Sequence, residues 1–147
     1  MPYVTYESQI RAPTELVWAL LCEKAEHPER FYPGLREVEI LERRDDGVLR
    51  QVTTDDGEVR RERLVTDEER MRISATLFDH PVYSGTAVCQ LSLPSDGPLL
   101  RCELSWIPHS GAEPESASQL DAMVLAGLKS VIARAEAEDS KGKAASG

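Results

Sequence analysis

One polar pattern stands out because it places a charged side chain within an apolar strand. Arg50 lies between Val48 and Val52 in a segment that alternates with period two, so one strand face carries two valines and a guanidinium. If residues 55–57 form a three-residue loop, Arg50 lies directly opposite Glu62 on the next strand. Such a cross-strand pair would satisfy both charges.

Two alternatives compete with this pairing. A two-residue turn at 56–57 would place Arg50 opposite Arg63, where the like charges repel unless an anion lies between them. Arg50 and Glu62 can also form a solvated salt bridge on the outer face. We expect Arg50 to point inward, because exposing two valines is unfavourable, and to contact Glu62, because an unpaired buried guanidinium costs several kcal/mol.

Other reactive residue types form no recognisable constellation. His80 and His109 lie in predicted loops; a histidine is a general base at neutral pH, but neither stands beside a nucleophile, so both are interpreted as surface residues. The basic cluster at 60–63 is interleaved with acidic residues and lacks a glycine-rich loop. It is interpreted as a solvated strand edge rather than a phosphate site. No catalytic residue is identified.

The cysteines argue against metal and disulfide chemistry. Cys22, Cys89 and Cys102 are odd in number, have no CxxC spacing, and lie in apolar-patterned segments. We interpret them as reduced thiols that pack as small hydrophobes. No metal, cofactor or disulfide is expected to be needed for folding.

Composition bounds the class of protein. A chain of 147 residues with 41% hydrophobic and 29% charged residues has the size and balance of one globular domain. The formal net charge of −9 disfavours nucleic-acid and membrane-surface binding, since both partners are anionic. With no signal-like leader and no long apolar run, a cytoplasmic monomer or homodimer is expected.

Seven segments alternate with the period of β-strands, and compact turn signals separate the last six. Links this short favour antiparallel neighbours, so these six strands should form a meander. The predicted strands span residues 3–10, 35–44, 48–54, 58–66, 70–77, 85–93 and 99–107.

Two segments have helical periodicity. The first follows Thr14, a candidate N-cap, and places Trp18, Leu21, Cys22 and Ala25 on one face. The second spans residues 118–138. Its apolar stripe comprises Leu120, Met123, Val124, Gly127, Val131, Ile132 and Ala135. Residues 139–147 have nothing to bury and are predicted to be a disordered tail after a single domain at 1–138.

The order of these elements, and several motifs, resemble a known superfamily. Residues 12–18 (APTELVW) are similar to the opening of the first helix in the START and birch-pollen-allergen (SRPBCC) superfamily. Within it, the chain is most similar to the AtaL-like group, whose activity is undefined, through residues 17–18, 24–33, 38–42, 49–53 and 61–65. His27 departs from the asparagine expected in that group.

The resemblance implies an α+β helix-grip fold, in which a seven-stranded curved antiparallel sheet wraps around a long C-terminal helix. It also implies an internal cavity for a hydrophobic, polyketide-like or other apolar metabolite, of ligand size (about 300 Å³ or more). The expected ligand-binding residues are Arg50, Glu62, Phe78, Tyr83, Trp106, Met123 and Gly127. The supply of only eight aromatic residues is consistent with an incompletely filled interior.

Three functions remain open at this point. The first is a binding protein with cyclase- or aromatase-type catalysis and no metal, in which Arg50 or a tyrosine steadies an enolate. The second is a passive carrier or sensor without chemistry. The third is a protein-interaction domain with a solid core. Under the first two, replacing Arg50 by Met should weaken ligand binding more than stability.

Overall fold

The computed structural model describes residues 3–32, 34–78, 83–94, 97–109 and 115–146. Two α-helices, α1 (Thr14–Glu26) and α2 (Glu115–Ser146), and a short 3₁₀ helix, η1 (Pro28–Arg30), accompany seven strands. The strands are β1 (Tyr3–Gln9), β2 (Leu35–Arg44), β3 (Gly47–Thr54), β4 (Val59–Asp67), β5 (Arg72–Phe78), β6 (Tyr83–Ser92) and β7 (Leu99–Pro108). All seven predicted strands are present, with ends shifted by at most two residues.

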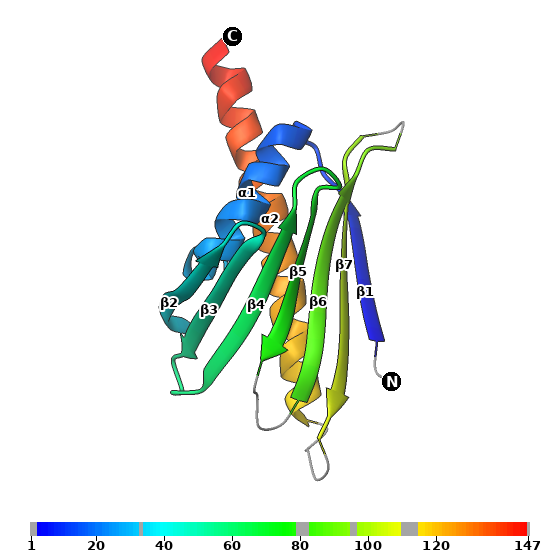
Figure 1. Ribbon diagram of the computed structural model, residues 1–147. Coiled ribbons are helices and arrows are strands. Elements are labelled where there is room, and N and C mark those ends of the chain that lie inside the picture. Colours follow the sequence, from blue (N-terminus) through cyan, green and yellow to red (C-terminus); the bar gives the residue numbers. More distant parts are fainter. Residues whose placement is uncertain (1–2, 33, 79–82, 95–96, 110–114, 147) are drawn as a thin grey trace.

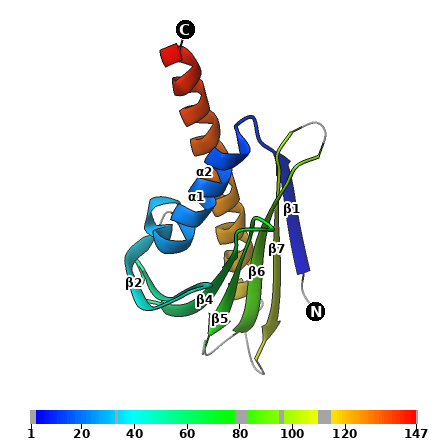
Figure 2. The same ribbon diagram turned by 45° about the horizontal axis from the view of Figure 1, so that its top comes forward.

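The strands form one antiparallel sheet in the order β1-β7-β6-β5-β4-β3-β2 (Figure 1). Strands β2 to β7 follow one another as the predicted meander, and β1 closes the order by pairing with β7. Figure 2 shows the sheet curving around the helices, which lie on its concave side. The predicted helix-grip arrangement is confirmed.

The hairpin between β3 and β4 settles the register around Arg50. The backbone N–H of Thr54 donates to the carbonyl of Glu58 at 2.9 Å, which closes a three-residue loop. Gly57 in that loop has φ +90°, a left-handed conformation that favours glycine. Arg50 therefore pairs with Glu62, as predicted, and the two-residue turn that would place it opposite Arg63 is wrong.

Helix α1 differs from the prediction in its cap. Pro13 is the N-cap residue and Thr14 is the first helical residue, so Thr14 does not cap the helix with its side chain. A proline is well tolerated at a helix start, because the backbone N–H groups there have no intrahelical acceptor and the missing N–H breaks no helical hydrogen bond. The buried residues Val17, Leu20, Leu21 and Ala25 include only two of the four predicted for the apolar face, Trp18 and Cys22 being half-buried.

Helix α2 is longer than predicted at both ends. Gly127, Val131 and Ala135 of the predicted stripe are buried, and Leu128 joins them. Residues 139–146 continue the helix instead of forming an irregular tail, and Figure 1 shows this end extending beyond the sheet. The sequence there has no proline and includes two lysines and two alanines, which are good helix formers and favour continuation of the helix.

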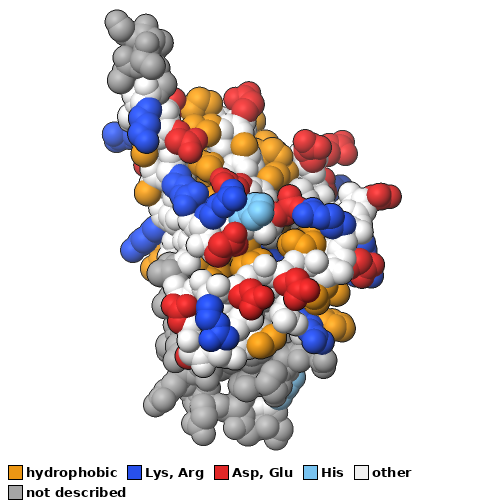
Figure 3. All heavy atoms as spheres, turned by 90° about the vertical axis from the view of Figure 1, so that its left-hand side faces the viewer, with side chains coloured by type: hydrophobic (Ala, Val, Ile, Leu, Met, Phe, Trp, Pro, Cys, Tyr) orange, Lys and Arg blue, Asp and Glu red, His pale blue; other side chains and the backbone are white. Residues whose placement is uncertain are grey.

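The core lies between the concave face of the sheet and the two helices. Its buried cluster joins Val17 and Leu21 of α1, Leu64 and Leu100 of the sheet, and Val131 of α2. On the face that carries α1 and β2, acidic and basic side chains are intermingled (Figure 3). Ion pairs such as Arg43–Glu26 are exposed on the surface.

The contact between α2 and Tyr32 generates a stability prediction. A Cβ atom at Gly127 would lie 2.5 Å from Tyr32 Oη and 2.6 Å from its Cζ, so any side chain there must displace the ring. Gly127→Val should lower the free energy of unfolding by about 1–3 kcal/mol through overpacking. Chemical denaturation measures this loss.

Ala133→Val is the matched control, because it adds a β-branched residue to an exposed position of the same helix. It should cost less than about 0.7 kcal/mol from helix propensity alone. Equal stability of the two variants would show that α2 does not pack on Tyr32 as described.

Candidate functional site

A cavity of about 120 Å³ lies between the C-terminal part of α1 and the concave face of the sheet. Its walls are mainly aliphatic, and the strands that supply them alternate, so that every second side chain faces inward. The aliphatic wall includes Leu21, Leu64, Ile73, Ala75, Leu77 and Leu104. The described residues therefore leave a small space between α1 and the sheet.

The volume of the cavity is smaller than expected. It falls short of the 300 Å³ or more that encloses a drug-sized ligand. An engineered apolar cavity of about 150 Å³ in another protein admits benzene, which sets the relevant scale. The space therefore suits one ring-sized group rather than an entire polyketide chain.

Arg50 lines the cavity and is 6% exposed. Its Nε and Nη2 donate to Glu62 Oε1 at 3.2 and 3.0 Å. Its Nη1 donates to the backbone carbonyls of Lys24 and Ala25 at 3.2 and 2.6 Å. These carbonyls belong to the last turn of α1, where backbone acceptors lack helical partners and a cation is favoured. Arg50 therefore joins two strands to the end of a helix.

Arg60 lines the cavity, although the sequence predicted that it lies on a solvated strand edge. The segment 60–63 was interpreted as a solvated strand edge, but β4 lies between β3 and β5 and is internal. The Arg60 side chain is only 10% exposed, lines the cavity and pairs with Glu58 at 3.1 Å. Period two separates it from Arg61, which is exposed and donates to Gln51.

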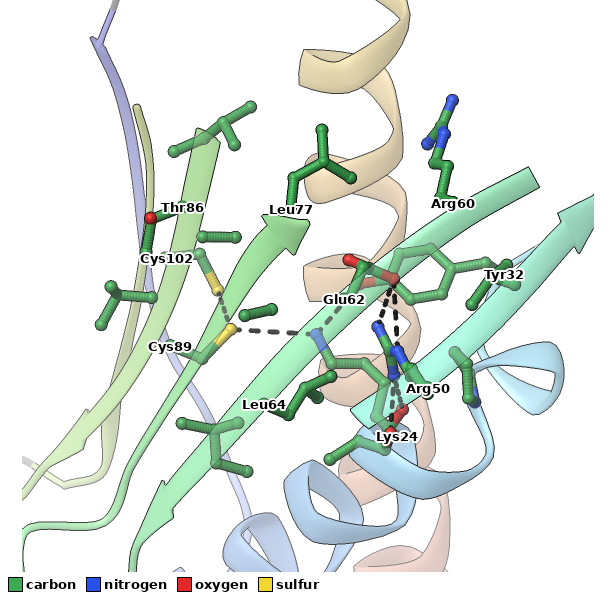
Figure 4. Close-up of a pocket in the computed structure, with 18 of the residues that line it drawn as sticks. Lys24, Tyr32, Arg50, Arg60, Glu62, Leu64, Leu77, Thr86, Cys89 and Cys102 are labelled. Carbon is green, nitrogen blue, oxygen red and sulfur yellow. Dashed lines mark hydrogen bonds and ion pairs between the residues drawn. The ribbon is translucent and has the colours of Figure 1, made fainter. Parts of the chain in front are cut away.

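Lys24 extends its side chain from α1 into the cavity (Figure 4). Its Nζ donates to Tyr32 Oη at 3.2 Å and lies 3.8 Å from Cys89 Sγ. Burial by itself lowers the pKa of Lys24, but the charges of Cys89, Tyr32 and Cys102 raise it, and the net direction is upward. Lys24 is therefore an ammonium, and no carboxylate in the described part of the chain lies within ion-pair distance of it.

Cys89 and Cys102 face each other across β6 and β7. They are directly paired in register, and their Sγ atoms are 3.1 Å apart. A hydrogen bond from Cys102 lowers the pKa of Cys89 to about 6; burial opposes this, and the Lys24 ammonium adds to it. The same interaction with Cys89, followed by burial, raises the pKa of Cys102. These opposite shifts favour a pair that shares one proton near neutral pH, with the negative charge on Cys89 beside the Lys24 ammonium.

The predicted ligand-binding residues are only partly brought together. Arg50 and Glu62 line the cavity, and Gly127 packs against Tyr32, which also lines it. Phe78 does not: it is 53% exposed, because Ile73, Ala75 and Leu77 take the inward positions of β5 and Phe78 follows on the opposite face. The side chains of Tyr83, Trp106 and Met123 lie outside the described residues.

The remaining reactive residue types contribute little to this site. His27 is exposed and lies 3.3 Å from Glu29, and His109 is exposed and hydrogen-bonds Ser84; His80 lies outside the described residues. Within the described part of the chain, no cluster of three or more His, Cys, Asp or Glu residues is arranged to hold a metal ion. Nor does either helix have a stretch there that is long and apolar enough to span a bilayer.

Sequence signals existed for the residues that were missed. Lys24 lies three residues after Leu21 and one before Ala25, so it borders the apolar face of α1. The turn at 94–98 makes a hairpin in which Cys89 and Cys102 are nearly equidistant from the centre. Their opposition follows from the same register argument that paired Arg50 with Glu62.

Comparison with known proteins agrees with this architecture. The family model described as acetylaranotin biosynthesis cluster protein L, AtaL, matches residues 12–122. No curated protein sequence matches the chain.

Solved structures with the same fold cover nearly all of the chain at low identity. The ZhuI aromatase/cyclase from Streptomyces sp. R1128 has a TM-score of 0.75 at 21% identity, over 92% of this chain and 93% of that one. A START superfamily protein from Mycobacterium smegmatis has a TM-score of 0.70 at 17% identity, over 91% and 97%. The di-domain ARO/CYC protein StfQ of the steffimycin biosynthetic pathway has a TM-score of 0.70 at 22% identity, over 93% of this chain and 46% of that one.

The contacts of Arg50 change the outcome expected for its replacement. Arg50→Met leaves Glu62 and two helix carbonyls without their donor, so the free energy of unfolding should fall by about 3–5 kcal/mol. This loss makes stability, rather than ligand binding, the property most affected. Urea denaturation of the variant tests it.

Arg43→Met is a suitable control, since Arg43 pairs with Glu26 of the same helix on the exposed surface. That change should cost less than about 1 kcal/mol. If Arg50→Met costs no more than Arg43→Met, Arg50 does not hold α1 in the way its contacts indicate.

Proposed function

The chain belongs to the AtaL family, and from this premise we propose that it binds a ring-sized apolar group bearing an acidic oxygen. The ring would occupy the aliphatic part of the cavity. The oxygen would accept from the Lys24 ammonium and the Tyr32 hydroxyl. The proposal narrows the expectation of a polyketide-like or other apolar metabolite to the group that this cavity can enclose.

The observation that carries the proposal is a lysine side chain in a mainly aliphatic cavity, with its Nζ atom 3.8 Å from the sulfur of Cys89, whose pKa is lowered. Aliphatic walls strengthen electrostatic interactions, because little water is present to screen them. A ligand that brings a weakly acidic hydroxyl can transfer its proton to Cys89 and leave its oxygen on Lys24. Charge is conserved in this exchange, and the thiolate is replaced by a ligand anion beside the same ammonium.

Arg50 is less suited than Lys24 to hold the ligand oxygen. Four of the donor contacts of Arg50 already go to Glu62 and the end of α1. Lys24 has three N–H donors, and Tyr32 and Cys89 occupy two directions around them. Each cation thus keeps one N–H donor, but the charge of Arg50 is already paired with Glu62, whereas the Lys24 ammonium lines the cavity without a carboxylate partner among the described residues.

4-Nitrophenol tests this arrangement because it is ring-sized and its phenolate absorbs visible light. The protein should bind it as the phenolate at a pH below the pKa of the free phenol. Lys24→Met should weaken binding about tenfold or more, since a hydrogen bond to a charged group contributes about 1.5–3 kcal/mol. Titration followed by absorbance measures both effects.

Lys129→Met, the same substitution at an exposed position of α2, should leave binding unchanged. Nitrobenzene, which lacks the hydroxyl, should bind more weakly than 4-nitrophenol to the unmodified protein and equally to both variants. Equal binding of 4-nitrophenol by Lys24→Met and the unmodified protein would refute the assignment.

Enolisation is a second candidate function, favoured by the position of Cys89 beside Lys24. A thiolate next to an ammonium is a base and an electrophile in one site, as proton removal next to a carbonyl requires. Two of the similar structures carry aromatase/cyclase names, and enolate formation is a step that such chemistry needs. Here Lys24 and Tyr32, rather than Arg50, would steady the enolate.

Acetophenone in D₂O separates this candidate from passive carriage. The protein should accelerate exchange of the methyl hydrogens, seen as loss of their proton NMR signal. The rate should rise as pH increases through about 6, where Cys89 becomes a thiolate, and then level off. Cys89→Ala should abolish the acceleration, whereas Cys22→Ala should retain it.

If the protein does not accelerate this exchange over the rate in buffer, it binds its ligand without catalysing enolisation, as a carrier or sensor does. In that case 4-nitrophenol would still bind, so the two readouts separate the candidates.

A further inference from the structure

We propose that Cys89 and Cys102 form a dithiol site in the cavity wall, at which a hydroperoxide oxidises Cys89 and Cys102 then closes a disulfide. This inference is independent of the proposed ligand and concerns the reactivity of the pair itself. It rests on register, on the distance between the sulfur atoms and on the neighbouring ammonium.

The backbone geometry allows the bond. Residues directly opposite in antiparallel strands have Cα atoms about 4.5 or 5.5 Å apart, depending on the hydrogen-bonding position. Both spacings fall in the range of about 4.4–6.8 Å that disulfides require. With the two Sγ atoms at 3.1 Å, closure needs a movement of side chains and leaves the β6–β7 pairing in place.

The two thiols have different roles because their surroundings differ. Cys89 is half-buried, lines the cavity and lies 3.8 Å from the Lys24 ammonium. Cys102 also lines the cavity, but it is only 2% exposed and no contact between it and Lys24 is formed. A peroxide that enters the cavity therefore reacts at Cys89, and Cys102 is the resolving thiol.

The reaction balances without a further reactant. The Cys89 thiolate attacks one oxygen of ROOH; an S–O bond forms, the O–O bond breaks, and the alkoxide takes a proton from the Lys24 ammonium to leave as ROH. The Cys102 sulfur then attacks the Cys89 sulfenic acid; an S–S bond forms, and the S–O bond breaks. The leaving hydroxide takes the Cys102 proton as water. Two thiols are oxidised, and one hydroperoxide is reduced to an alcohol.

The effect of the lowered Cys89 pKa on the rate is moderate. At pH 7 a thiol with a pKa of about 6 is almost fully ionised, roughly two orders of magnitude more than one near the ordinary value. Intrinsic nucleophilicity falls by about half a logarithmic unit for each unit of pKa, so the net gain is several-fold. Cys89 is therefore the thiol that reacts first mainly because it is accessible from the cavity and lies beside Lys24, and only in part because its pKa is lowered.

Cumene hydroperoxide and hydrogen peroxide, each supplied to the reduced Cys22→Ala protein, test the proposal. Intact-mass analysis should show loss of two hydrogen atoms per chain, and both free thiols should disappear together. Cys102→Ala in the same background should stop at a sulfenic acid that dimedone traps. Cys89→Ala should keep its remaining thiol under the same conditions.

The relative rates identify the source of the peroxide. Each rate is divided by that of glutathione with the same peroxide. A larger ratio for cumene hydroperoxide assigns the site to apolar organic hydroperoxides, which suit the aliphatic cavity. A larger ratio for hydrogen peroxide assigns it to the small oxidant.

Lys24→Met tests whether Lys24 acts on the reactivity of Cys89, because loss of a purely structural contact would not change the pH at which Cys89 ionises. The pH midpoint of Cys89 alkylation by iodoacetamide should rise from about 6, oxidation at pH 7 should slow several-fold, and Lys24→Arg should restore part of both. Lys129→Met should change neither. Persistence of both thiols while glutathione is oxidised, or formation of disulfides only between chains, would overturn the proposal.

Discussion

The guanidinium of Arg50 fixes the geometry on which the rest of the site depends. It is nearly excluded from water, so each of its contacts must compensate for lost hydration. Glu62 supplies the opposite charge from the neighbouring strand, and the carbonyls of Lys24 and Ala25 supply the end of α1. A leucine at this position would fill space equally well, but it would not hold the helix end at a fixed height above the sheet.

Holding the backbone of Lys24 in place has a direct consequence for its side chain. The carbonyl of Lys24 accepts from Arg50, while its Nζ atom contacts Tyr32 and Cys89 in the cavity. Gly127 completes the arrangement, because the absence of a side chain lets α2 approach the Tyr32 ring. The position of one ammonium thus depends on β3, α1 and α2 together, which explains how a charge can be held inside an apolar cavity.

Strand alternation and turn length, which can be read from the sequence, correctly predicted the pairing of neighbouring strands. The alternation of Val48, Arg50 and Val52, together with a glycine-containing loop, was enough to place Glu62 opposite Arg50. Lys24 was missed because a lysine beside an apolar helix face is usually solvated, and only the packing of α1 on the sheet turns it inward. Phe78 was expected among the ligand-binding residues, but the alternation that begins at Ile73 places its side chain outside the cavity.

The charge of the two cysteines decides what the cavity can accept. If both were thiols, Lys24 would face the cavity as an uncompensated cation, at a large cost in solvation. If both were thiolates, two negative charges would lie 3.1 Å apart. The state with one proton between them balances the ammonium, and the pair titrates as a unit rather than as two independent groups. A ligand oxygen or a peroxide therefore meets a site in which base, proton donor and reducing equivalent are already adjacent. An anionic oxygen that replaces Cys89 beside Lys24 should therefore bind together with a proton on Cys89, because only then does the charge of the site stay balanced.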